Sequence, residues 1–116
     1  MGQYEEAVES QTTDRLAQEG LIQRFEYTFE LGWKTLQDLL KERGLEEVRG
    51  PKPVIQQAFK DGLVGDGSIW LEMLRARNQA EFLYDESIFK ELYQKSTGLF
   101  FKALCDFKTG LKRCHD

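Results

Sequence analysis

Four charged side chains recur at steps of four in the first third of the chain. They are Glu26, Glu30, Lys34 and Asp38. In a helix, side chains four residues apart lie on the same face, so these groups would form one charged stripe. The pattern predicts either a solvated, salt-bridged stripe or a half-buried carboxylate among the neighbouring aromatic side chains. A half-buried carboxylate at Glu26 or Glu30 needs a cationic partner, and Arg77 is the candidate.

A second polar group lies at the junction between two expected helices. Arg77 and Asn78 end one helix, and Tyr84 precedes the next. These side chains could line a binding site, or Arg77 could cap the last carbonyls of its helix while Tyr84 packs against the core. The chain has a single histidine, His115, one residue from its end. Because histidine is the usual general acid or base, phosphoryl or acyl chemistry would need a partner chain or an unusual site.

Helical periodicity dominates the elements that must position these residues. The longest apolar face covers residues 21–43, where apolar side chains recur every three or four positions. Further helices are expected over residues 3–18, from Pro51 or Pro53 to Asp61, after a cap at Asp66 or Ser68, and as one helix from a cap at Asp85 to about Leu111. They predict an all-α fold, an antiparallel up-and-down bundle of four to five helices in a single domain covering residues 1–116.

Composition limits the classes of function. The chain has 116 residues, of which 41% are apolar. This is enough for one packed core and a higher apolar content than disordered chains have. The formal net charge is −4, whereas a dedicated nucleic-acid-binding protein usually carries a basic surplus. No apolar stretch approaches the roughly 20 residues that span a membrane, and the first residues are acidic and polar, so we expect a cytoplasmic protein without a membrane partner.

The segment over residues 22–36 resembles a known family signature. Its sequence, IQRFEYTFELGWKTL, is similar to the IQRFEFTFELAWK signature of the nucleotidyltransferase substrate-binding proteins. These helical proteins have the HEPN (higher eukaryote and prokaryote nucleotide-binding) fold and are related to HepT. Three further segments agree with the family: VIQQAFKDGL from Val54, WLEML from Trp70, and Arg77-Asn78 followed by Tyr84-Asp85-Glu86. The resemblance extends from about Asp14 to Leu111.

This resemblance implies a subunit that binds the acceptor substrate for a separate minimal nucleotidyltransferase, in a toxin–antitoxin-like two-component system. The partner would supply the nucleotide, Mg²⁺ and the catalytic carboxylates, so this chain needs no cofactor, metal ligand or catalytic residue of its own. The substrate-binding residues would be Arg77, Asn78, Tyr84, Lys34, Glu30 and Trp33. Tyr84 also matches the tyrosine that such partner enzymes modify with AMP. A homodimer is implied as well, and we expect it to form through helix faces around Trp33, Trp70 and Phe82.

One position departs from the Arg-x4-His-x-Tyr motif of the family. Arg77 and Tyr84 match the motif, but Phe82 stands in place of its histidine. In ribonuclease toxins of this fold, the Arg and His of two protomers form the RNA-cleaving site, and phenylalanine cannot donate, accept or transfer a proton. We therefore expect a non-catalytic subunit. Two alternatives stay open: a metal-independent ribonuclease toxin, with Glu81 replacing the histidine and Arg77 stabilising the phosphorane, or a scaffold dimer without a ligand site.

Overall fold

The computed structural model describes residues 14–79 and 84–115, with side chains as far as residue 109. The described residues form five α-helices and no strand. These helices are α2 (Arg15–Glu42), α3 (Pro51–Lys60), α4 (Gly67–Gln79), α5 (Glu86–Thr97) and α6 (Leu99–His115). The all-α prediction is confirmed. Within this part of the chain, no helix combines the length and apolar character that crossing a bilayer requires.

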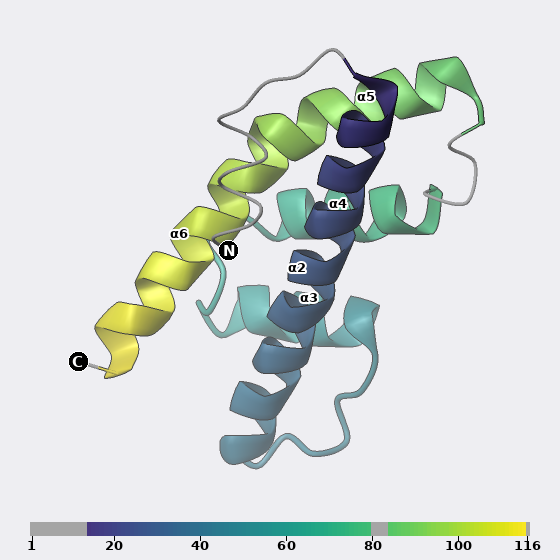
Figure 1. Cartoon of the computed structure of the whole chain (residues 1–116). Helices are drawn as coiled ribbons and strands as arrows, with labels where there is room; N and C mark the ends of the chain where they lie inside the picture. Colours follow the sequence, from purple (N-terminus) through teal and green to yellow (C-terminus); the bar gives the residue numbers. More distant parts are fainter. Residues whose placement is uncertain (1–13, 80–83, 116) are drawn as a thin grey trace.

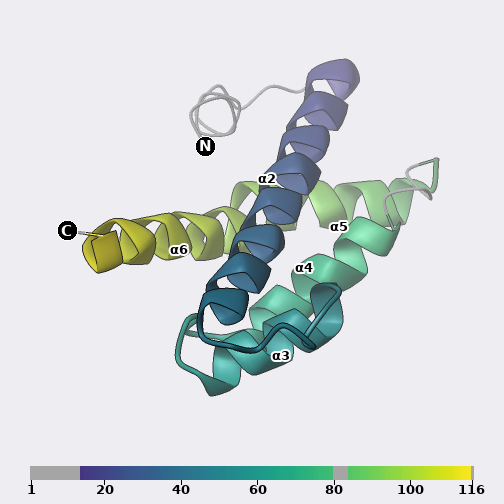
Figure 2. The same cartoon turned by 90° about the horizontal axis from the view of Figure 1, so that it is seen from below.

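The central helix is α2, which contacts each of the other four described helices. In Figures 1 and 2, α5 and α6 follow one another along nearly the same line and cross α2 obliquely, and α3 packs against both α2 and α4. Apolar residues every three or four positions give α2 one wide buried face. Its buried residues are Leu21, Ile22, Phe25, Phe29, Gly32, Trp33, Leu36 and Leu40. This helix therefore sets the positions of all the others.

Stacked aromatic rings join α2, α4 and α6. The ring centroids of Phe25 and Phe100 are 5.0 Å apart, and those of Phe29 and Trp70 are 5.9 Å apart. Trp70 also meets Phe107 edge-on, with centroids 5.1 Å apart. Aromatic pairs of this kind add about 0.5–1.5 kcal/mol each beyond the area they bury. Because Trp70 is only 2% exposed, it is a core residue.

The start of α2 differs from the sequence-based prediction. Two helices were expected over residues 3–18 and 21–43, and residues 3–13 lie outside the described part of the chain. Residues 15–42 form one helix that passes through Gly20 without interruption. Asp14 caps this helix, because its Oδ1 atom accepts a hydrogen bond from the backbone N–H of Leu16 at 3.1 Å. The expected break before Leu21 is therefore wrong.

The segment after Asp85 forms two helices, where the sequence analysis predicted one. A single helix from Asp85 was expected, but Gly98 separates α5 from α6, with φ −119° and ψ −94°. The two helices keep nearly the same direction because hydrogen bonds flank the break: the N–H of Gly98 donates to the Lys95 carbonyl at 3.3 Å, and that of Lys102 to the Gly98 carbonyl at 3.0 Å. Phe89 on α5 and Phe100 on α6 thus both reach the core.

The predicted starts and stops of the middle helices are confirmed. Pro51 occupies the first turn of α3, where its missing N–H costs nothing. Asp66 precedes α4, and its Oδ1 atom accepts hydrogen bonds from the N–H groups of Ser68 (3.0 Å) and Ile69 (3.4 Å). Gly44 follows α2 with φ +89°, a left-handed conformation that favours glycine. These local signals set where α3 and α4 begin and where α2 ends.

Candidate functional site

The carboxylate of Glu30 is the centre of a polar cluster on α2. The Nη2 atom of Arg77, from α4, lies 2.6 Å from Glu30 Oε1. The indole N–H of Trp33 donates a hydrogen bond to Glu30 Oε2 at 3.1 Å, and the Nζ atom of Lys34 lies 3.9 Å from the same oxygen. The structure thus brings together four of the six predicted substrate-binding residues. The prediction that Arg77 neutralises a carboxylate of α2 is confirmed.

The ion pair between Glu30 and Arg77 is partly buried. The side chains are 26% and 34% exposed, and Glu30 Oε1 itself is buried. The contact qualifies as an ion pair but not as an aligned hydrogen bond, since Oε1 lacks a hydrogen-bond partner of good geometry. A guanidinium carries five N–H donors, and the contact with Glu30 occupies one end of it. Arg77 therefore retains donors for a second anionic group such as a phosphate.

Glu26 lies one helical turn before Glu30 and is half-buried. Burial raises the pKa of the Glu26 carboxyl above its usual value, and the nearby Arg77 guanidinium offsets part of that rise. Further along the stripe, Lys34 and Asp38 are exposed. Both sequence-based interpretations therefore hold in part: Glu26 and Glu30 are half-buried carboxylates, and the C-terminal half of the stripe is solvated.

The residues on either side of the connection between α4 and α5 point toward solvent. Asn78 is exposed near the end of α4, and Tyr84 is 81% exposed just before α5. Asp85 caps α5, because its Oδ1 atom accepts hydrogen bonds from the N–H groups of Ser87 at 2.9 Å and Ile88 at 3.3 Å. The alternative in which Tyr84 packs against the core is wrong. The phenol is presented by a capped helix start.

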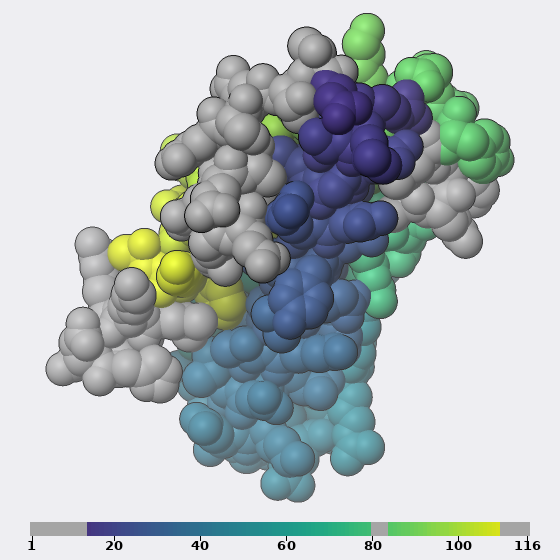
Figure 3. Space-filling view, viewed as in Figure 1, coloured from purple at the N-terminus to yellow at the C-terminus, as the bar shows by residue number. Residues whose placement is uncertain are grey.

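Two expectations about this junction have other outcomes. Phe82, the residue in place of the family's histidine, and Glu81, its suggested substitute, lie outside the described residues. Trp33 and Trp70 were expected on a dimer face, but they are 9% and 2% exposed and belong to the core of this chain. That part of the dimer-face prediction is wrong, because both indoles pack within the bundle. The outer face of α2, which lies at the front in Figure 3, instead exposes Tyr27 and Leu31, at 68% and 51%.

An ion pair that the sequence analysis did not predict joins α2 to α5. Arg15, in the first turn of α2, places its Nη1 atom 2.6 Å from Glu86 Oε1 in the first turn of α5. Its Nε atom lies 3.3 Å from Glu19 Oε1, and its Cζ atom lies 3.5 Å from the ring centroid of Phe89. Arg15 falls in the helix that was expected from the sequence over residues 3–18, and no role was assigned to it there. A buried aromatic three residues after a helix-start acid could have suggested this cation site.

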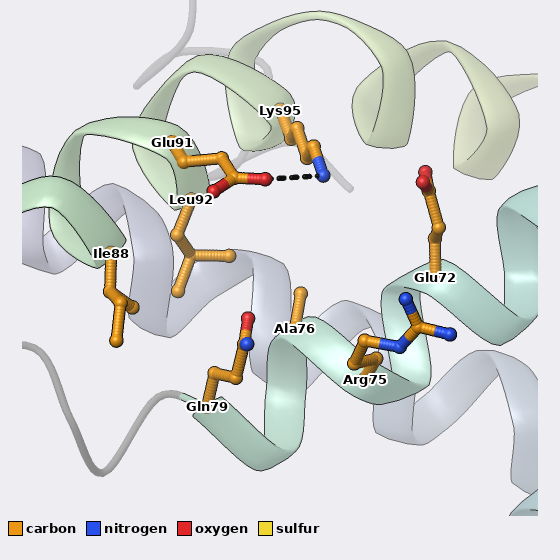
Figure 4. A pocket seen from close by; sticks show the side chains of 8 residues that line it. All are labelled: Glu72, Arg75, Ala76, Gln79, Ile88, Glu91, Leu92 and Lys95. Atoms are coloured by element: carbon orange, nitrogen blue, oxygen red, sulfur yellow. Dashed lines mark ion pairs between the residues drawn. The ribbon is translucent and has the colours of Figure 1, made fainter.

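Two hollows in the surface also went unpredicted. A small one of about 140 Å³ lies between α4 and α5 (Figure 4), where Arg75 and Glu72 face the ion pair of Lys95 with Glu91 at 2.9 Å. Its two acidic and two basic side chains balance, so it shows no preference for an anion. A larger groove of about 620 Å³ lies between the end of α2, the loop before α4 and the start of α6, with mainly apolar walls. Among the described residues, no group of His, Cys, Asp or Glu side chains could hold a metal ion.

Comparisons with known proteins identify the family. A family model described as "Nucleotidyltransferase substrate binding protein like" matches residues 1–113. A probable ribonuclease HepT from Haemophilus influenzae is 31% identical over 71 residues, which are 58% of this chain and 49% of that protein, so the match spans about half of the relative's length. The crystal structure of ttk003001694 from Thermus thermophilus superimposes with a TM-score of 0.75 at 29% identity, covering 95% of this chain and 97% of that one. The chain therefore belongs to the nucleotidyltransferase substrate-binding protein-like family.

Proposed function

We propose that this protein is the accessory subunit of a two-component system in which a separate minimal nucleotidyltransferase transfers AMP to Tyr84. The family to which the chain belongs supports a nucleotidyltransferase as the partner. The observation that carries the proposal is the exposure of Tyr84. At 81%, it is the most exposed of the large apolar and aromatic side chains among the described residues. A tyrosine side chain this exposed is accessible to the active site of another protein.

The transfer needs little from this chain beyond a presented hydroxyl. The Tyr84 phenol oxygen attacks the α-phosphorus of ATP, forming a P–O bond as the bond to the β-phosphate breaks. Pyrophosphate leaves, and the phenol proton passes to a base of the partner. Because the partner supplies that base, the Mg²⁺ and the nucleotide, a histidine at position 82 is unnecessary.

The Glu30 cluster would serve this reaction by binding rather than by chemistry. Arg77 is held by Glu30 at 2.6 Å and keeps donors for a phosphate, and Asn78 adds an exposed amide nearby in sequence. Lys34 adds a second, exposed cation on the same face of α2. We assign these residues to docking the nucleotide-loaded partner. On α2, Glu30 contacts Arg77, and Arg15 contacts Glu86, two residues after Tyr84. Arg15 and Glu30 are fifteen positions apart, about 22 Å along the helix, so the contact with the partner would be extended.

The test is co-expression with a minimal nucleotidyltransferase from the neighbourhood of this gene, the partner that the proposal requires, followed by intact-mass measurement of the present chain. We expect one adenylyl group on the wild type and none on Tyr84→Phe. The matched control is Tyr27→Phe, which removes the hydroxyl of another exposed tyrosine, 68% exposed on α2. This control should be modified like the wild type. A wild-type chain that co-purifies with the partner but keeps its unmodified mass would overturn the assignment.

A second candidate function is ribonuclease activity, favoured by the name of the HepT relative from Haemophilus influenzae. It would rest on Arg77, with Glu81 as the substitute for the histidine. RNA cleavage by the purified chain, scaling with its concentration and lost in Arg77→Lys, would establish it. Lysine keeps the positive charge beside Glu30 but lacks the planar guanidinium fork, so the variant changes phosphate recognition more than folding.

We further propose that the subunit is a homodimer that uses the exposed face of α2. Tyr27 and Leu31 are one helical turn apart and are 68% and 51% exposed, so together they offer an apolar strip. Multi-angle light scattering should report a dimer for the wild type and a shift toward monomer for Leu31→Lys. A Leu31→Lys variant that remains fully dimeric would exclude this strip as the interface.

A further inference from the structure

Arg15 is placed to control the position of Tyr84. Glu86, to which its guanidinium binds at 2.6 Å, is the first residue of α5 and lies two residues after Tyr84. The contact joins positions 71 residues apart in the chain, from the first turn of α2 to the first turn of α5. In Figure 1, the N-terminal end of α2 lies beside α5. The backbone that carries Tyr84 is thus tied to α2 within two residues of the tyrosine.

Three contacts fix the orientation of the Arg15 side chain. Its Nε atom approaches Glu19 Oε1 at 3.3 Å, one turn further along α2, and the side chains of Arg15 and Glu19 are each 40% exposed. The guanidinium lies over Phe89, with its Cζ atom 3.5 Å from the ring centroid. Phe89 is 4% exposed and therefore does not move freely. Arg15 thus contacts one buried ring and two carboxylates, of which Glu86 is 79% exposed, so its position depends on three contacts rather than on a single ion pair.

The same helix also holds the other end of the junction. Glu30 on α2 binds Arg77 near the end of α4, and Arg15 on α2 binds Glu86 at the start of α5. Both flanks of the α4–α5 connection therefore take their positions from α2. The Asp85 cap stabilises the first turn of α5, and only Asp85 separates Glu86 from Tyr84, so the position of Glu86 constrains the backbone of Tyr84.

We infer that Arg15 is a positioning residue for Tyr84, which acts through its contacts with Glu86 and Phe89 to aim the phenol at the partner's active site. This inference rests on the proposed function, the transfer of AMP to Tyr84. In this role Arg15 acts through α5 and takes no part in the chemical step. Losing it leaves the acceptor present but misaligned, and misplacing a reacting atom by about 1 Å can slow a reaction by as much as 100-fold.

The experiment compares Arg15→Met, Arg15→Lys and wild type as substrates of the neighbouring nucleotidyltransferase with ATP and Mg²⁺. Arg15→Met should lower kcat by about tenfold or more with little change in KM for the chain, because docking through the Glu30 cluster is intact. Arg15→Lys keeps a cation beside Glu86 but loses the planar guanidinium over Phe89, so it should recover only part of the rate. The matched control is Lys95→Met, which removes another ion pair of α5, with Glu91 at 2.9 Å, and should leave kcat unchanged.

Hydrogen exchange on each chain alone gives a readout that does not depend on the partner. In Arg15→Met, the amides of Ser87 and Ile88 should exchange faster, while amides of α6 keep their wild-type protection. A kcat of Arg15→Met equal to wild type, with wild type modified on Tyr84, would overturn the inference and leave the proposed function standing. A kcat that falls only in proportion to the folded fraction would overturn it too. If wild type takes no adenylyl group, the proposed function fails first and this role of Arg15 falls with it.

Discussion

The ion pair between Glu30 and Arg77 should make a measurable contribution to folding stability. Breaking a fully buried ion pair costs about 3–5 kcal/mol, whereas exposed pairs contribute about 0–1 kcal/mol. With side chains 26% and 34% exposed and a separation of 2.6 Å, this pair falls between those limits. We expect a coupling energy of about 1–2 kcal/mol, between the values for exposed and fully buried ion pairs.

A double-mutant cycle measures this coupling. The variants Glu30→Gln, Arg77→Met and their combination are unfolded in urea, and the free energies of unfolding are compared with wild type. Each single variant should be destabilised, and the double variant should be more stable than the sum of the two losses predicts. Trp33 gives a second readout, since its indole N–H donates to Glu30 Oε2 at 3.1 Å and its fluorescence should change in Glu30→Gln.

The control cycle uses the exposed pair of Glu91 and Lys95 on α5, whose side chains are 66% and 33% exposed. Both pairs join a carboxylate to a long cation at under 3 Å; they differ in the cation, in the exposure of the carboxylate and in the i,i+4 placement. We expect a coupling of at most about 0.5 kcal/mol in the control. A coupling for Glu30 and Arg77 no larger than the control value would refute the argument that the partly buried cluster is fixed in place.

Three further variants concern α2. Gly32→Val should destabilise the fold by about 1–3 kcal/mol, because even a Cβ atom at this position would lie 3.1 Å from a ring carbon of Trp70. Gly20→Ala should stabilise the fold by up to about 1 kcal/mol in the same urea titration, because a Cβ atom there meets only the flexible end of a neighbouring side chain, at 3.4 Å. The raised pKa of Glu26 means that the folded chain holds this proton to higher pH than the unfolded chain, so wild type should lose stability as pH rises above 4.5. Glu26→Gln should not show this loss, and its gain in stability at neutral pH should be at most about 1 kcal/mol, because the group is half-exposed and lies near Arg77. A pH series of unfolding titrations in which wild type and variant run parallel would exclude this effect.

The helices could be predicted from the sequence wherever local chemistry decides them. The caps at Asp66 and Asp85 and the proline start of α3 depend on neighbouring residues alone, and all three are confirmed. The boundaries at Gly20 and Gly98 could not be predicted, because each glycine weakens a helix by a similar amount. Packing determines which glycine interrupts a helix. Leu21 and Ile22 are buried directly after Gly20, and their packing keeps α2 helical there.

Part of the polar site could also be predicted. The step of four from Glu26 to Glu30 and the aromatic residues around them indicated half-buried carboxylates and a need for Arg77, which the 2.6 Å contact confirms. The contact of Arg15 with Glu86 could not be predicted, since it joins residues 71 positions apart and depends on how α5 crosses α2. The exposure of Tyr84 likewise follows from the placement of α5, which no local pattern encodes.

The most direct test of the central claim is peptide-level mass spectrometry of the chain after reaction with the proposed nucleotidyltransferase partner, ATP and Mg²⁺. Trypsin should release a peptide from Asn78 to Lys90, in which Tyr84 is the only tyrosine and Ser87 is the other hydroxyl. Fragmentation should place one adenylyl group on Tyr84. An unmodified peptide recovered from a stable, ATP-loaded complex, or an adenylyl group found on Ser87, would contradict the claim that Tyr84 is the acceptor.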